Sequence, residues 1–243
     1  MSYIKEICVA GATIEISKYY NYYNRPKGAP RAAPEKPTTE QQRKNNERRA
    51  EKKLRRLMNA NFEPGDYHIN LNYAKELRPD NKADMRENVR KFLRRLRKEY
   101  KKHGKELKYI HVMEIGSKGA MHHHLVINRL DVELIRKAWN KGRVHIYPLD
   151  DTGQYAQLAS YLIKYTSKTF NTEDSLQGKR WDSSRNLIKP KIKKKVIHRN
   201  VFRSEPKEKK GYYIDKNSIM DYISSETGYQ YMTYTLVRIT KRE

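Results

Sequence analysis

Strict alternation of apolar and polar residues between Tyr67 and Tyr73 commits this segment to a β-strand with two unlike faces. The apolar face carries Tyr67, Ile69, Leu71 and Tyr73. The polar face carries His68, Asn70 and Asn72. A helix cannot produce this separation, because its side chains do not change face at every second residue. We therefore expect one face of the strand to lie against a core and the other to remain polar.

An amphipathic helix is expected next. Apolar residues recur at three-to-four spacing at Met85, Val89, Phe92, Leu93, Leu96 and Tyr100. The residues between them are largely Arg and Lys, so the opposite side of the helix is strongly basic. Such a helix can cover the apolar side of the sheet.

Further elements follow from similar patterns. We expect strands at residues 3–9, 13–19, 108–115, 120–127 and 143–148, and near 196–203 and 229–239. We expect helices at residues 41–60, 131–140 and 154–168. The central order of strand, helix, strand, strand, helix, strand, helix predicts an α+β fold with an antiparallel sheet backed by helices.

Composition and punctuation suggest four segments. Residues 1–37 hold a β-hairpin and a proline-rich linker, and residues 38–60 form a basic helix that docks by its last turns. Residues 61–170 form the principal domain. Residues 171–243 are expected to be a basic extension that packs on that same domain.

The charge balance points to a polyanionic partner. Lys and Arg number 53 against 28 Asp and Glu, which gives a formal net charge of +25. Self-repulsion of this size is best tolerated where nucleic acid offsets it, and the 19 tyrosines could stack on bases or fill the core. With one cysteine, no signal peptide and no membrane span in the sequence, we expect a cytoplasmic protein without a membrane partner.

Three consecutive histidines mark the strand expected at residues 120–127. Strand periodicity places His122 and His124 on one face and sends His123 to the other, where we expect a packing role. Glu114 joins the first pair if it lies opposite His122 in the hairpin. Two imidazoles and one carboxylate could hold a divalent metal ion, Mg²⁺ or Mn²⁺. The alternative is a set of hydrogen-bonded surface histidines without metal.

The helix expected at residues 154–168 repeats the pattern Tyr-x-x-Lys, at Tyr161/Lys164 and at Tyr165/Lys168. Helical geometry places Tyr161 opposite the apolar arc and between the two lysines, so it is the preferred nucleophile. Tyr165 lies at the edge of that arc and is either a packed side chain or a second nucleophile. A surface stripe of Tyr and Lys without reactivity is the simpler alternative.

Together these motifs resemble those of the HUH endonuclease superfamily, in particular rolling-circle replication initiators of bacterial phages and plasmids. Residues 119–125, Gly-Ala-Met-His-His-His-Leu, are similar to the family's paired-histidine motif, although His123 replaces an apolar residue. Residues 70–73 resemble the first motif but carry Asn where Thr is more common. Tyr161-x-x-Lys164 is similar to the third motif, and residues 180–190 resemble a segment that follows the catalytic helix.

The resemblance implies a ferredoxin-like or RRM-like sheet and an enzyme that nicks and rejoins single-stranded DNA at a replication origin. It implies a 5′-phosphotyrosine intermediate and a free 3′-hydroxyl. The catalytic residues would be Tyr161, Lys164 and Tyr165, and the metal ligands Glu114, His122 and His124. The DNA contacts would be Asn70, Asn72, Lys168, Arg180, Arg185 and Lys189. The sequence contains no P-loop, so a host helicase and a polymerase would be partners.

Basic residues of segments 86–102, 164–168 and 189–199 are expected to hold the phosphates of a strand that crosses the polar face of the sheet. Two other functions fit the same patterns. One is an HUH relaxase or single-strand transposase. The other is a non-catalytic RRM-like protein in which the histidines and Tyr161 merely contact nucleic acid.

Overall fold

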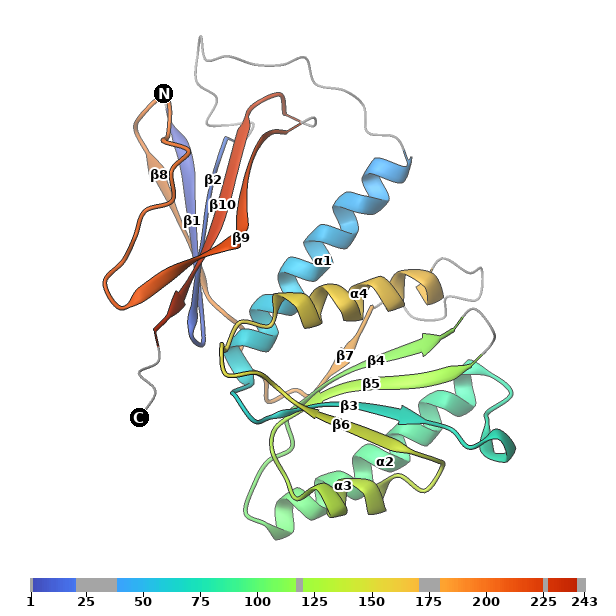
Figure 1. Ribbon diagram of the computed structural model, residues 1–243. Coiled ribbons are helices and arrows are strands. Elements are labelled where there is room, and N and C mark those ends of the chain that lie inside the picture. The colour runs from blue at the N-terminus through green and yellow to red at the C-terminus, as the bar shows by residue number, and fades with distance from the viewer. Residues whose placement is uncertain (1, 21–38, 117–119, 171–179, 225–226, 240–243) are drawn as a thin grey trace. The chain divides into compact units, whose positions relative to one another are not determined.

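Two antiparallel five-stranded sheets and four α-helices account for the part of the chain that the computed structural model describes, which confirms the α+β class (Figure 1). The described residues are 2–20, 39–116, 120–170, 180–224 and 227–239, without the side chains of 167–170. The expected linker at 21–37 and most of the turn at 116–119 fall outside them. The chain divides into two compact units, and each is described separately.

The first unit comprises residues 1–49, 152–154 and 189–243. Its sheet has the strand order β8-β1-β2-β10-β9. The strands are β1 (Tyr3–Ala10), β2 (Thr13–Tyr19), β8 (Ile192–Ile197), β9 (Tyr212–Ile223) and β10 (Gln230–Arg238). Its apolar core includes Tyr3, Ile16, Phe202, Met232 and Tyr234.

This sheet departs from the expected division of the chain. The hairpin β1–β2 forms as expected, but β8 and β10 pair directly with it, so residues 189–243 build a sheet with the N-terminus. They do not form an extension of the domain at 61–170. The central strands β1 and β2 are apolar enough to require partners on both edges, and the C-terminal segment provides them.

The second unit comprises residues 50–151 and 155–188 and contains the principal domain. Its sheet has the strand order β6-β3-β5-β4-β7. The strands are β3 (Tyr67–Asn72), β4 (Tyr109–Ile115), β5 (Met121–Ile127), β6 (Val144–Pro148) and β7 (Asp182–Ser183). Every pairing is antiparallel, with β5 at the centre between β3 and β4.

Helices α2 (Lys82–Lys102) and α3 (Val132–Ala138) cover one face of this sheet (Figure 1). Apolar side chains of α2, such as Phe92 and Leu96, pack against Ile69 and Leu71 of β3 in one core cluster. The alternation of β3 and the amphipathic pattern of α2 are therefore confirmed. The short 3₁₀ helix η1 (Lys75–Leu77) connects β3 to the loop before α2.

The opposite face is covered by α4 (Ala156–Phe170) and the last turns of α1 (Thr39–Asn61). Ile110 and Val126 of the sheet pack there against Leu54, Met58 and Leu162. The two sides of the sheet thus have separate cores, one under α2 and α3 and one under α4 and α1. None of the helices in the described ranges is both long enough and apolar enough to cross a membrane.

A tight crossing fixes the loop after α3 against β3. Gly142 has a backbone φ of 154°, and a Cβ atom there would overlap the backbone oxygen of Asn72 and the backbone nitrogen of Ala74. The chain on either side of the glycine is tied to β3 by hydrogen bonds from Asn72 N to Arg143 O and from Ala74 N to Lys141 O. Only glycine fits such an approach.

The core beneath α2 contains a buried polar chain around His123, which confirms that this histidine faces away from His122 and His124. Its Nε2 lies 2.7 Å from the Tyr73 hydroxyl, and its Nδ1 lies 3.0 Å from Nε2 of His111. Tyr73 also hydrogen-bonds Asn88 of α2. Burial lowers the pKa of His111 to about 3 and lowers that of His123 as well, so both imidazoles are neutral.

The docking of α1 through its last turns can be tested by mutation. Leu54 is fully buried, so Leu54→Ala should leave a cavity and lower the free energy of unfolding by about 2–5 kcal/mol. Leu57→Ala is the matched control, since Leu57 is only partly buried in the same cluster and should cost less. Urea denaturation of both variants measures the difference. Equal losses would contradict the docking.

The buried histidines predict a stability that depends on pH. The unfolded chain takes up protons on its histidines below about pH 6.5, while folded His111 stays neutral down to about pH 3. The stabilisation is complete above pH 6.5 and is lost as the pH falls toward 3, by up to about 1.4 kcal/mol per pH unit for each such histidine. Urea denaturation at pH 7 and pH 5 should show the loss. The variant His198→Gln, which removes an exposed imidazole, should retain it; an unfolding free energy equal at both pH values would contradict the prediction.

Candidate active site

Strand register brings the expected site residues into two adjacent rows on the face that α4 covers. Glu114, His122 and Asn72 lie opposite one another on β4, β5 and β3, and His124 lies opposite Asn70 in the neighbouring row. Directly opposed residues of an antiparallel sheet point to the same face. The pairing of Glu114 with His122, on which the carboxylate's orientation depends, is therefore the one expected.

Hydrogen bonds connect these side chains into a small network. His124 Nε2 lies 2.7 Å from Glu114 Oε2, and His122 Nδ1 lies 2.6 Å from Asn72 Oδ1. On the other side of its ring, His124 Nδ1 lies 3.4 Å from Nε2 of His68. The His68 ring stacks on the His124 ring at a centroid distance of 5.6 Å. His68 and Glu114 thus hold His124 from both sides.

The buried histidines of this face are neutral. Burial, with a smaller contribution from His122, lowers the pKa of His124 to about 4. Burial, with a smaller contribution from His124, also lowers the pKa of His68 to about 4. The contact between His124 and Glu114 is therefore a hydrogen bond at neutral pH and not an ion pair. A neutral imidazole is also the form that can bind a metal ion.

The donor set fits a divalent ion by type and by face. Within the described residues, no three His, Cys, Asp or Glu side chains stand arranged as metal ligands, because Glu114 and Asn72 engage the two imidazoles. If His124 bound a metal through Nε2, its proton would move to Nδ1, where His68 could accept it. The side-chain oxygen of Asn70 is buried beside His124 without a hydrogen-bond partner, as expected where a ligand binds.

Both tyrosines of α4 lie against this network. The ring of Tyr161 meets the ring of His124 edge to face at 5.6 Å, and the ring of Tyr165 stacks on His124 at 5.7 Å. The two phenols contact each other at a centroid distance of 4.5 Å. Tyr161 is 39% exposed and Tyr165 is half-buried, so Tyr161 is the more accessible phenol, as expected.

The environment of Tyr161 stabilises its protonated form. Burial raises its pKa to about 12, helped by the neighbouring Tyr165, by a hydrogen bond with Tyr165 and by the carboxylate of Glu114. The phenol is thus protonated at neutral pH. Reactivity would require a positive charge near the hydroxyl or an acceptor for its proton.

The expected basic residues are distributed more widely than the sequence suggested. Lys164 is exposed on α4, and the side chain of Lys168 falls outside the described residues. Arg180 is half-buried just before β7, and Arg185 is exposed in the turn after it. Lys189 is exposed and belongs to the other unit.

One expectation about the cations is wrong. The basic residues of segment 86–102 lie on α2, which covers the face opposite the histidines, so they cannot line the same face as Tyr161. The pattern of α2 predicted which side of the helix is apolar. It could not predict on which side of the sheet the nucleophile's helix would pack.

Two aromatic residues of the site were not singled out from the sequence. His68 contacts His124 and meets the ring of Tyr161 at 6.0 Å, and Tyr147 of β6 stacks on His68 at 5.9 Å. Tyr147 is 53% exposed. The alternation of β3 placed His68 on the polar face, which was the available signal. The position of Tyr147 depends on the pairing of β6 with β3.

Comparison with known proteins supports a replication role for this unit. Residues 66–170 match the model of a protein family described as Replication-associated protein ORF2. No curated protein and no solved structure matches the chain. The matched segment begins just before β3 and ends with α4, so it contains the histidines, the carboxylate and both tyrosines. This similarity is consistent with a replication initiator.

Proposed function

We propose that this protein is a metal-dependent endonuclease and strand transferase of the HUH type, which nicks and rejoins single-stranded DNA at an origin to start rolling-circle replication. The observation that carries the proposal is the contact of Tyr161 and Tyr165 with His124, whose ring is bound to Glu114. A nucleophile candidate and a candidate metal-binding face lie within one side-chain layer.

The family match and the charge support the same assignment. The matched segment covers the whole site, and a net charge of +25 suits a phosphodiester substrate. Exposed Tyr147 and Tyr161 offer surfaces on which unpaired bases can stack beside the histidines. A strand lying over β3 and β5 would have its phosphates near Glu114 and its bases near these rings.

The covalent step is an in-line displacement at phosphorus. The oxygen of Tyr161 attacks, the bond from phosphorus to the 3′-oxygen breaks, and the 5′-phosphate becomes attached to the tyrosine. The phenolic proton passes toward its hydrogen-bond partner Tyr165, and the departing 3′-oxygen takes up one proton as it becomes a hydroxyl. Attack by that hydroxyl on the phosphotyrosine reverses the step and rejoins the strand.

Glu114, His122 and His124 are the residues that would hold Mg²⁺ or Mn²⁺, which would polarise a phosphate oxygen of the scissile bond. His68 orients His124 through its Nδ1 atom, and Asn72 orients His122. Lys164 and the basic residues near β7, Arg180 and Arg185, would hold the strand by its phosphates. A host helicase and a polymerase would then extend the free 3′-hydroxyl.

The choice of nucleophile can be tested with phenylalanine variants. Tyr161→Phe should abolish the covalent adduct with a labelled origin oligonucleotide and leave binding intact, because it removes only the attacking oxygen. Tyr165→Phe should retain adduct formation, since Tyr161 is the more exposed phenol. Denaturing gels with and without divalent metal measure both. Adducts that persist in Tyr161→Phe and vanish in Tyr165→Phe would assign the reaction to Tyr165.

The metal role can be separated from DNA affinity. His122→Ala combined with His124→Ala should eliminate cleavage at any Mn²⁺ concentration, because no imidazole ligand remains. Affinity for single strands should change little, since most of it comes from counterion release at cationic residues. Anisotropy titrations at several salt concentrations provide the comparison. Undiminished nicking by the double variant would refute the metal role, and binding without any adduct in the unmodified protein would favour a non-catalytic binding protein.

A further inference from the structure

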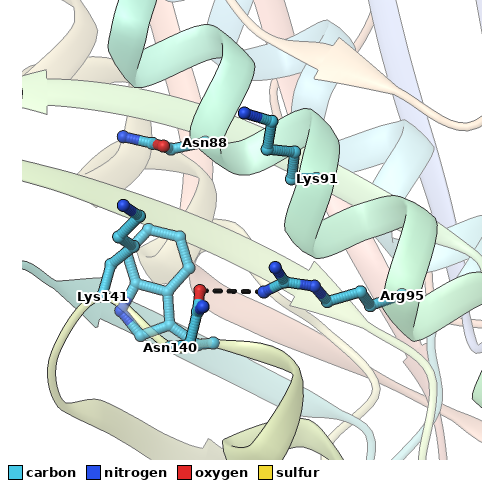
Figure 2. A pocket seen from close by; sticks show the side chains of 6 residues that line it. Asn88, Lys91, Arg95, Asn140 and Lys141 are labelled. Atoms are coloured by element: carbon cyan, nitrogen blue, oxygen red, sulfur yellow. Dashed lines mark hydrogen bonds between the residues drawn. The ribbon is translucent and has the colours of Figure 1, made fainter.

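A cavity of about 150 Å³ lies between α2 and the turn after α3, on the side of the sheet that faces away from Tyr161. The residues that line it are Asn88, Lys91, Arg95, Trp139, Asn140 and Lys141. In Figure 2, Lys91 and Arg95 on α2 face Asn140 and Lys141 across the opening. The function proposed above uses none of these side chains.

The lining is cationic and partly fixed in place. Three of the six side chains are Lys or Arg, and none is acidic. The guanidinium of Arg95 is held by the backbone oxygen of Ala138 at 3.2 Å and by Asn140 Oδ1 at 2.8 Å. Lys91 has its acidic neighbour Glu87 at 3.9 Å with both side chains half exposed, which is a weak interaction. Trp139 is 4% exposed and forms a rigid wall. Such a cavity suits an anion.

Size limits the anion to a small group. Pockets that enclose a whole small molecule have volumes of roughly 300–1,000 Å³. The present cavity is smaller, so a complete nucleotide would not be enclosed. A single phosphate group fits better, either free or as part of a chain that continues over the surface.

The surface beside the cavity favours the chain. Lys91, Arg95, Lys98 and Lys102 follow one another at helical spacing along a single side of α2, and all four are exposed. We call these four residues the α2 stripe. At a rise of about 1.5 Å per residue, the stripe extends for about 16 Å. Phosphates of one duplex strand are spaced about 3.4 Å along the axis, so the stripe matches about five of them.

The absence of stacking surfaces distinguishes duplex from single-stranded nucleic acid. Among the described residues of α2 and α3, no aromatic side chain is exposed, whereas Tyr147 and Tyr161 are exposed on the other side of the unit. Proteins that bind single strands combine cations with aromatic platforms. Cations alone are sufficient for the sequence-independent contacts made to a duplex backbone.

We propose that this cavity binds a backbone phosphate of duplex DNA and that the α2 stripe follows the same strand. One side of the sheet then holds the duplex, and the other holds the strand to be cut. The assignment rests on the proposed function only in that the duplex is the DNA adjoining the nicked strand. Lys141, held to β3 through its backbone oxygen, places its charge beside the cavity without help from a mobile loop.

The test removes two cations from the cavity. Lys91→Gln combined with Lys141→Gln leaves Arg95 in place, because its guanidinium supports the end of α3. Binding to two short blunt duplexes of unrelated sequence is measured by anisotropy over a range of salt concentrations. The slope of log affinity against log salt should fall by about two, equally for both sequences. The control, Lys44→Gln combined with Lys53→Gln, removes the same charge from exposed positions of α1 and should have a smaller effect.

Each outcome decides between alternatives. An unchanged slope, or an equal loss in the control, would overturn the duplex site. An equal loss of affinity for single strands would also overturn it, because the cavity would then belong to the single-strand path. Adduct formation on a short single-stranded oligonucleotide should be unchanged by the cavity variant. If the unmodified protein forms no adduct but the duplex effect remains, the proposed nicking function fails and the duplex site stands.

Discussion

The pairing of β5 with β3 on one side and β4 on the other is the constraint on which the rest of this unit depends. It aligns Glu114, His122 and Asn72 in one row and places His124 in the next. The same pairing turns His123 into the opposite core, where Tyr73 and His111 bind it. One set of backbone hydrogen bonds therefore fixes both the candidate catalytic face and a polar chain inside the core.

Periodicity alone predicted much of this unit. The alternation in β3, the amphipathic pattern in α2 and the docking of α1 by Leu54 and Met58 all appear in the structure. The second sheet was less accessible to such reasoning. Residues 212–223 contain a turn-like stretch around Asp215 and Asn217, which in the structure is an irregularity in the pairing of β9 with β10. Strand β8 carries three consecutive lysines, which a sheet tolerates at an edge and which no alternating pattern reveals.

The site could be outlined from sequence but not completed. Residue types and spacing identified Glu114, His122, His124 and the two tyrosines as candidates, and the register brings them together. The support from His68 and Tyr147 depends on the position of β6 beside β3, which local patterns do not determine. The pKa of Tyr161 is likewise a property of the assembled site. The lysines of α4 suggested a more acidic phenol, whereas burial and a hydrogen bond with Tyr165 raise its pKa.

The sequence of β5 does not itself specify its register, because three histidines are followed by three apolar residues. Insertion or deletion of a single residue near the start of this strand would exchange the histidines between the faces. His123 would enter the catalytic layer, and its two neighbours would be buried beneath α2 without the partners that satisfy them. Length changes in the hairpin should therefore be far more damaging than substitutions there. The threefold histidine run makes the protein unusually sensitive to frame, as distinct from composition, along one short strand.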